Sequence, residues 1–119
     1  MIRFDRASIA RGGQIVVESL TAAWPAGRAV ALVGRSGAGK TALLAAAAAA
    51  LPLHAGEILI EGRSVRREAD AVRRLVGYAP AVPPAWPGLR AGEFLELFEA
   101  TAGLSGTGLR AAVDRGLTL

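Results

Sequence analysis

The chain has 119 residues, the length of one small domain, and its 52% hydrophobic and 20% charged residues are typical of a packed core and not of a disordered segment. Cysteine is absent, so the sequence predicts neither a disulfide framework nor a thiolate metal site. The longest apolar run, residues 42–51, is shorter than the ~20 residues of a membrane-spanning helix, and the N-terminus has no apolar stretch typical of a signal peptide. We therefore expect a cytoplasmic chain.

The net charge is +4, and arginines gather in one segment, at Arg63, Arg66, Arg67, Arg73 and Arg74. A basic cluster can mark a surface that binds nucleic acid. Here Glu68 and Asp70 are interleaved with the arginines, which favours the other interpretation, a solvated helix face. We expect no nucleic-acid partner.

The predicted elements begin with two strands, 2–8 and 14–20, joined by a turn at 11–13. A buried strand is predicted over 28–33, and a helix over about 40–51, ended by Pro52. The helix contains a run of alanines, which are strong helix formers and would let it lie close to a sheet. Low complexity explains the run equally well, and the sequence does not separate the two.

The second half of the chain contains shorter predicted elements. In chain order they are a strand bounded by glycines at 56–62, a short helix at 67–75, a strand at 75–79, a proline-rich loop at 80–90, an amphipathic helix at 93–101, a flexible joint at 103–108 and a last helix from Gly108 or Leu109.

Residues 34–41 carry the complete pattern G-x-x-x-x-G-K-[ST], as Gly34, Arg35, Ser36, Gly37, Ala38, Gly39, Lys40 and Thr41. The glycines let the backbone curl so that successive N–H groups face phosphate oxygens. Lys40, the only lysine of the chain, reaches the β- and γ-phosphates, and the Thr41 hydroxyl can bind Mg²⁺. The predicted strand before the loop and helix after it place the phosphates at a helix N-terminus. This context disfavours the alternative, a glycine-rich turn that binds nothing.

The order of elements resembles the N-terminal half of an ATP-binding-cassette (ABC) transporter nucleotide-binding domain. A strand pair precedes the phosphate loop, and the glycine-bounded strand 56–62 and the segments 76–80 and 89–93 follow it. The resemblance covers essentially the whole chain. It implies an α/β fold of the P-loop NTPase, ABC ATPase type, as one partial domain over 1–119. Its parts would be antiparallel strands and a core strand in 1–33, the P-loop and helix in 34–51, strands and the proline-rich loop in 52–90, and the start of a helical subdomain in 91–119.

The resemblance also assigns roles to single residues. Arg11 stands where the family has an aromatic residue that stacks on adenine, and an arginine plane can also stack on a base. Val16 matches the small apolar residue beside the base. Ala81 replaces the family's glutamine, which senses Mg²⁺ and the attacking water. Tyr78 and Trp86 are interpreted as packing residues.

Three family motifs have no match: the signature, the strand ending in Asp-Glu, and the switch histidine. The run 104–108 resembles the signature but comes too early, so we interpret it as a linker, and His54 as a surface residue. Glu57 and Glu61 belong to the earlier strand. No catalytic residue is therefore identified, and we expect a truncated chain that is inactive by itself.

Two functions stay open. The first is ATP binding, with Mg²⁺, in an ABC transporter ATPase subunit. Its partners would be a second nucleotide-binding domain and a transmembrane permease, through which the chain would lie at the inner face of the membrane. The second is a non-hydrolysing nucleotide-binding fragment or degenerate regulatory module. A small P-loop kinase is disfavoured by the two strands before the loop.

Overall fold

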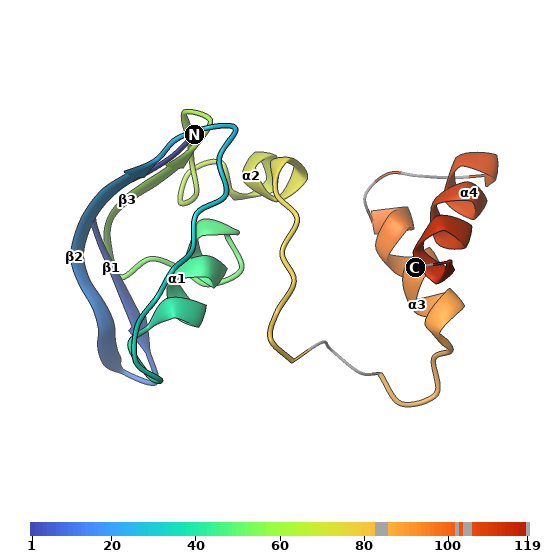
Figure 1. Cartoon of the computed structure of the whole chain (residues 1–119), viewed down its shortest axis with the longest axis horizontal. Helices are drawn as coiled ribbons and strands as arrows, with labels where there is room; N and C mark the ends of the chain where they lie inside the picture. The colour runs from blue at the N-terminus through green and yellow to red at the C-terminus, as the bar shows by residue number, and fades with distance from the viewer. Residues whose placement is uncertain (83–85, 102, 104–105, 119) are drawn as a thin grey trace. The chain divides into compact units, whose positions relative to one another are not determined.

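The computed structural model describes residues 1–82, 86–101, 103 and 106–118, and the chain divides into two compact units, residues 1–82 and 83–119. The first unit holds an antiparallel sheet with two helices, and the second holds a pair of helices (Figure 1). We call them the first unit and the second unit.

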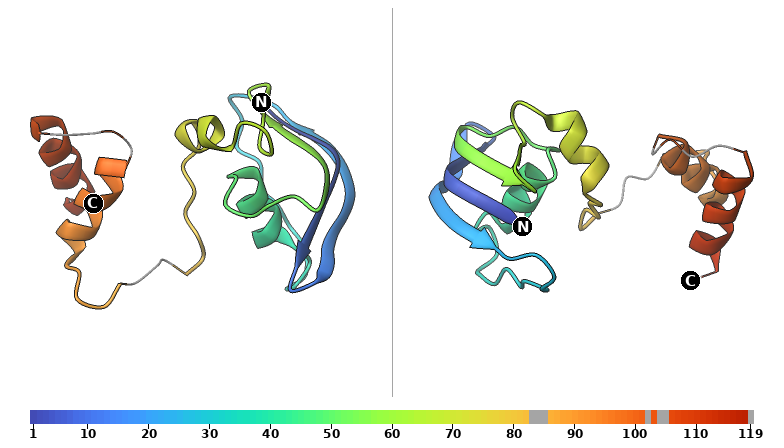
Figure 2. Two further views of the ribbon diagram at one scale, coloured as in Figure 1. Left: turned by 180° about the vertical axis from the view of Figure 1, so that it is seen from behind. Right: turned by 90° about the horizontal axis from the view of Figure 1, so that it is seen from above.

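The sheet of the first unit has four strands in the order β2-β1-β3-β4, with antiparallel neighbours throughout. The strands are β1 (Ile2–Arg11), β2 (Gln14–Trp24), β3 (Ala55–Ile60) and β4 (Arg63–Ser64). The hairpin predicted from the glycine turn is confirmed, with both of its strands longer than expected, as is the strand between the glycines at 56 and 62. The sheet is curved, and α1 (Lys40–Ala47) lies on its concave side in each view (Figure 2).

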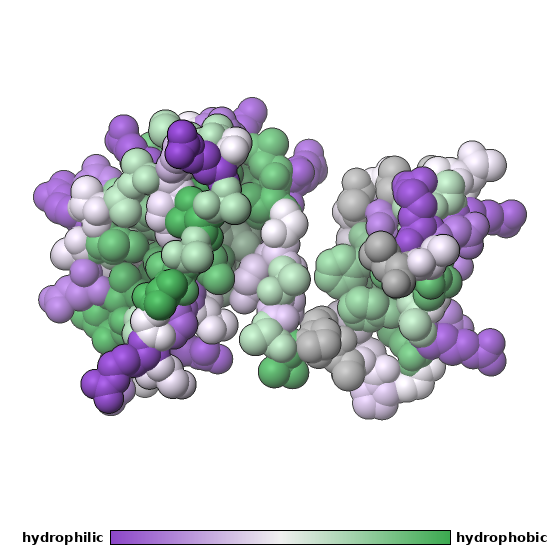
Figure 3. All heavy atoms as spheres, viewed as in Figure 1, coloured by the Kyte–Doolittle hydropathy of each residue, from purple (hydrophilic) through white to green (hydrophobic). Residues whose placement is uncertain are grey.

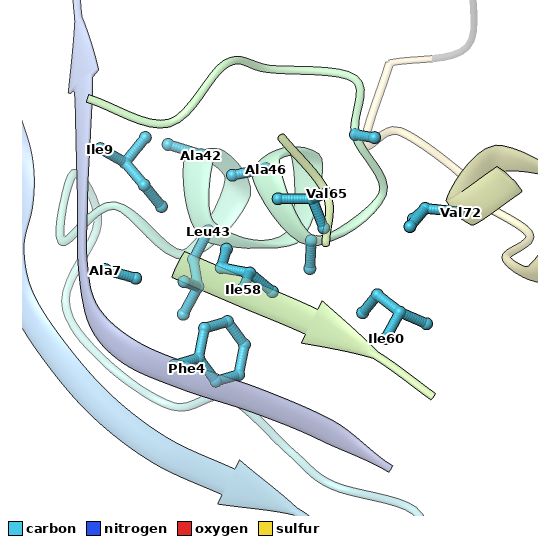
Figure 4. Close-up of a cluster of buried hydrophobic side chains, with 12 residues drawn as sticks. Phe4, Ala7, Ile9, Ala42, Leu43, Ala46, Ile58, Ile60, Val65 and Val72 are labelled. Carbon is cyan, nitrogen blue, oxygen red and sulfur yellow. The ribbon is translucent and has the colours of Figure 1, made fainter. Parts of the chain in front are cut away.

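The core forms between the sheet and α1 (Figure 4). Phe4 of β1 pairs in register with Ile58 of β3, and both side chains are buried against the helix. Ala42 and Ala46 face the sheet, and the Trp24 ring meets Phe4 edge-on with ring centroids 4.6 Å apart. Small helix residues thus let α1 approach the large strand residues closely, which favours the packing interpretation of the alanine run.

Gly56 fixes the contact between β1 and β3. The register of the two strands shifts between Asp5 and Ser8, and Gly56 lies opposite this irregularity with φ +75°. A Cβ atom on Gly56 would lie 2.0 Å from the carbonyl oxygen of Arg6. Only glycine therefore fits there, for its conformation and for its lack of a side chain.

Two predicted strands are absent from the sheet. Residues 28–33 are irregular, and in the strand predicted at 75–79 Leu75 is helical and residues 76–79 are irregular. Neither segment belongs to a strand pair of the described residues. Val30 and Val33 are exposed. Figure 3 shows hydrophobic side chains at the surface of the first unit in the view of Figure 1. An apolar extended segment becomes a strand only when a neighbour completes its hydrogen-bond ladder, and the described residues supply none.

The helix after the loop ends at Ala47, earlier than predicted. Ala49 adopts φ +53° and is buried, and the N–H groups of Ala50 and Leu51 both donate to the Ala45 carbonyl. Arg73 donates from Nε and Nη2 to the Ala49 carbonyl at 3.2 and 2.9 Å. The chain thus turns before Pro52 because a guanidinium and the core fix the residues after the helix.

The arginine cluster surrounds α2 (Ala69–Leu75), which begins two residues later than predicted. Ion pairs join Arg63 to Glu68, Arg67 to Glu57, and Arg73 to Asp70. Two of these three pairs use the interleaved residues Glu68 and Asp70, as a solvated helix face predicts.

The second unit consists of α3 (Ala91–Thr101) and α4 (Gly106–Leu117), which pack on each other. The Trp86, Phe94 and Phe98 rings form a row with successive centroids 5.6 and 5.2 Å apart. The predicted linker at 104–108 lies partly outside the described residues. Helix α4 begins within it, at Gly106 with φ +60°, and includes Gly108, so it begins earlier than expected. Residues 83–85 of the proline-rich loop also lie outside the described part.

None of the helices described here has both the length and the apolar character needed to cross a bilayer.

Candidate functional site

The loop at 34–41 connects the irregular segment 28–33 to α1. Gly37 and Gly39 adopt φ +79° and +86°, a conformation that L side chains rarely adopt. Gly34, in contrast, has no positive φ. Two of the three motif glycines therefore produce the curl of the loop, while Gly34 contributes a backbone carbonyl oxygen that accepts from Lys40.

Gly39 also brings the loop against β2. A Cβ atom at this position would lie 2.7 Å from the carbonyl oxygen of Val16 and 2.7 Å from Cγ2 of Val17. The register of β1 and β2 shifts here, because Val17 pairs with Ile9 while Ile15 pairs with Ala10. Val16 is the extra residue of this bulge, so a local irregularity of β2 lies in contact with the last glycine of the loop.

Lys40 bridges the two ends of the loop. Its Nζ donates to the carbonyl oxygens of Gly34 and Arg35, at 2.7 Å each. Two charge-assisted hydrogen bonds hold the ammonium group over the start of the loop, although Lys40 itself is the first residue of α1. The only lysine of the chain is therefore fixed at the concave side of the motif.

The N-terminus of α1 has no protein cap. Gly39 is its N-cap, no side chain accepts from its first N–H groups, and its first turn contains no acidic residue. The first hydrogen bond of the helix runs from the N–H of Leu43 to the carbonyl of Gly39. The N–H groups of Lys40, Thr41 and Ala42 are therefore not used within the helix, which is the arrangement that binds anions.

These features meet in one hollow of about 480 Å³. The hollow is lined by Arg11, Val16, Ser36, Gly37, Gly39, Lys40, Thr41 and Ala42. The structure thus brings Arg11 and Val16, from the β1–β2 hairpin, to the predicted phosphate loop. Gly34 and Arg35 contribute carbonyl oxygens to Lys40, and Ala38 lines a separate, more apolar hollow. Sequence reasoning missed Ala42, whose only signal was its place after Thr41.

The acidic residues Glu57 and Glu61 form their contacts outside the hollow. Glu57 accepts from the Ser64 hydroxyl at 2.8 Å and pairs with Arg67, and Glu61 pairs with the N-terminal ammonium. None of the residues that line the hollow is acidic. Within the described residues, no group of three histidine, aspartate or glutamate side chains gathers as a metal site. The site therefore presents two cations, N–H donors and the hydroxyls of Ser36 and Thr41, a donor set suited to an anion.

Residues outside the site lie as follows. His54 is exposed, as expected for a surface residue. Tyr78 is half-buried beside the end of α1, and Trp86 packs on Phe94. Ala81 is exposed and has no polar side-chain atom.

Known proteins resemble this chain over most of its length. A model of the ABC transporter family matches residues 17–117. The cytochrome c biogenesis ATP-binding export protein CcmA of Paraburkholderia xenovorans is 34% identical over 85 residues, which are 69% of this chain and 37% of that protein. ABC transporter A family member 2 of Arabidopsis thaliana is 31% identical over 88 residues, 72% of this chain and 9% of that protein.

A solved structure described as the ATP-binding subunit of an ABC transporter matches with a TM-score of 0.74 and 28% identity. The match covers 88% of this chain and 44% of that one, so the chain spans less than half the length of these relatives. Motif, fold and family model agree. The chain belongs to the ABC transporter family, with the α/β fold of part of its ATP-binding subunit.

Proposed function

We propose that the hollow at residues 34–41 binds a nucleoside triphosphate with Mg²⁺, as part of an ABC transporter ATPase subunit. The observation that carries the proposal is the convergence of Lys40, the uncapped N-terminus of α1 and the hairpin residues Arg11 and Val16 on one hollow. At about 480 Å³ the hollow has the size of a small-molecule site.

Each part of the loop has a proposed role. The free N–H groups at the start of α1 and the N–H groups of the loop bind the phosphate oxygens. Lys40 exchanges its carbonyl partners for the β- and γ-phosphates, since phosphate oxygens are the stronger acceptors. The exposed Thr41 hydroxyl is one oxygen ligand for Mg²⁺, which prefers to complete its shell with phosphate oxygens and water.

The complete transporter assembly is proposed by analogy with the family. There, hydrolysis of ATP between two nucleotide-binding domains drives a transmembrane permease, and the chain would work on the cytoplasmic side of the membrane. Phosphoryl transfer needs a positioned water and charge stabilisation in addition to phosphate binding. Lys40 and Thr41 supply the phosphate and metal contacts of that reaction.

A second candidate is a module that binds nucleotide without hydrolysing it. It is favoured by Ala81, which offers no polar group for water or Mg²⁺, and by the engagement of Glu57 and Glu61 away from the hollow. We expect the 119-residue chain to release no phosphate from MgATP above background in a steady-state assay. Turnover that disappears in Lys40→Ala would exclude this second candidate.

Calorimetric titration with MgATP tests the site itself. Lys40→Ala leaves phosphate charge without its cation, and we expect a loss of about 2–3 kcal/mol in binding free energy. Arg74→Ala is the matched control, because it removes one positive charge from an exposed position on α2 outside the hollow. Equal affinity of the wild type and Lys40→Ala would overturn the proposal.

A further inference from the structure

The β1–β2 hairpin contributes two residues, Arg11 and Val16, to the lining of the hollow. Arg11 is the last residue of β1 and pairs across the hairpin with Gln14, while Val16 touches the loop at Gly39. Gln14 and Val16 are two residues apart, so Arg11 lies about 7 Å farther along the hairpin than Val16, at the typical rise of a strand. This separation suits a ligand with phosphates at Gly39 and Lys40 and a second recognition group near Arg11.

Arg11 is available for such a contact. Its side chain is exposed, it lines the hollow, and it takes part in none of the ion pairs formed among the described residues. The guanidinium carries five N–H donors and no acceptor. The hollow offers no acidic side chain to neutralise it, so a ligand at this end gains by presenting acceptors.

We infer that Arg11 makes this site favour guanine over adenine nucleotides, an inference that rests on the proposed nucleotide-binding function. Guanine presents two adjacent acceptors, O6 and N7, which match the fork of a guanidinium. Adenine presents N7 beside the N6 amino group, whose hydrogens oppose the guanidinium donors. An aromatic residue at this position would stack on either base and distinguish them less.

The expected preference is moderate because the guanidinium is exposed. We expect MgGTP to bind about 5-fold more tightly than MgATP, near the lower end of what a forked arginine contact to guanine supplies. MgITP has O6 and N7 but no 2-amino group, and it should bind as tightly as MgGTP.

Substitutions at Arg11 separate base recognition from phosphate binding. In Arg11→Ala the affinities for MgGTP and MgATP should become equal within about 2-fold, as expected once the fork is lost. Arg11→Tyr should tighten MgATP and weaken MgGTP, because a ring stacks without desolvating a charge. Arg3→Ala, an exposed arginine of the same strand outside the hollow, should keep the 5-fold preference.

The experiment is calorimetric titration of the whole chain and these variants with the three nucleotides at one salt concentration. Equal affinities of wild type for GTP and ATP would overturn the inference, as would a preference that survives in Arg11→Ala. Binding of ITP at the ATP level would also overturn it, since the contact would then involve the 2-amino group. If Lys40→Ala abolishes binding of all three nucleotides while Arg11→Ala changes no ratio, the nucleotide site stands and only the base inference fails. If none of the three binds, the proposed function fails.

Discussion

The two units of the chain are stabilised in different ways. The first unit buries Phe4, Ile9, Ile58 and Val72 almost completely between a sheet and its helices. The second unit has no buried residue on α3 and only Ala112 and Val113 buried on α4. In its aromatic row Trp86 and Phe98 are exposed and Phe94 is half-buried. A sheet packed on a helix lets the first unit bury its apolar side chains and hold its loop in position, whereas two helices alone leave much of their apolar surface in water.

Tryptophan fluorescence can follow the units separately. Of the two tryptophans, Trp24 packs on Phe4 in the first unit and Trp86 packs on Phe94 in the second. Variants with a single tryptophan, Trp86→Phe and Trp24→Phe, would each report one unit during unfolding in urea. Each substitution is made in the single-tryptophan background that reports its own unit.

The largest effect is expected from Gly56→Ala. The added Cβ would lie 2.0 Å from the Arg6 carbonyl, so β1 and β3 must separate, at a cost of about 3–5 kcal/mol. Gly62→Ala is the control, with a similar φ of +80° and nothing within 4 Å, and should cost about 1–2 kcal/mol. Equal losses for the two variants, read from Trp24, would mean that the β1–β3 contact is not as tight as described.

The next prediction compares the same substitution, phenylalanine to alanine, in the two units. Phe4→Ala removes a side chain that is 1% exposed and should destabilise the first unit by about 3–4 kcal/mol. Phe94→Ala removes a half-buried ring and should cost the second unit about 1–2 kcal/mol. Each variant is followed by the tryptophan of its own unit. A larger loss for Phe94→Ala would reverse the comparison.

Arg73→Ala should have a moderate effect. It removes two donors from the Ala49 carbonyl after α1, which we expect to destabilise the first unit by about 1–2 kcal/mol. Arg74→Ala, on the same helix but exposed and in no ion pair of the described residues, should change stability by less than about 0.5 kcal/mol. Urea midpoints of both variants distinguish a capping role from a general effect of charge.

The smallest effect has the opposite sign. Gly108 lies inside α4 without a positive φ, and a Cβ there would have nothing within 4 Å. Gly108→Ala should therefore stabilise the second unit by about 0.5–1 kcal/mol through helix propensity. A loss of stability, read from Trp86, would show that the start of α4 is not helical in solution.

Sequence patterns predicted the elements that depend on residues close together in the chain. The glycine turn at 12–13 predicted the hairpin, and the motif at 34–41 predicted the start of α1 at Lys40. The strands expected at 28–33 and 75–79 were wrong, because an apolar pattern does not say which neighbouring strand pairs with it. The hydrogen bonds from Arg73 to the Ala49 carbonyl and the contact of Gly39 with Val16 join residues more than twenty positions apart, so no local pattern could reveal them.

The central claim is that Lys40 faces bound phosphates, and the composition of the chain allows a direct test. Lys40 is the only lysine, so an amine-reactive acylating reagent has two targets, its Nζ and the N-terminal amine. Mass spectrometry of the digested protein would measure both modification rates with and without a saturating Mg-nucleotide. We expect the rate at Lys40 to fall at least about tenfold with nucleotide, by the shielding of a charge-assisted contact, and the rate at Met1 to stay unchanged. An unchanged rate at Lys40 under saturating nucleotide would contradict the account.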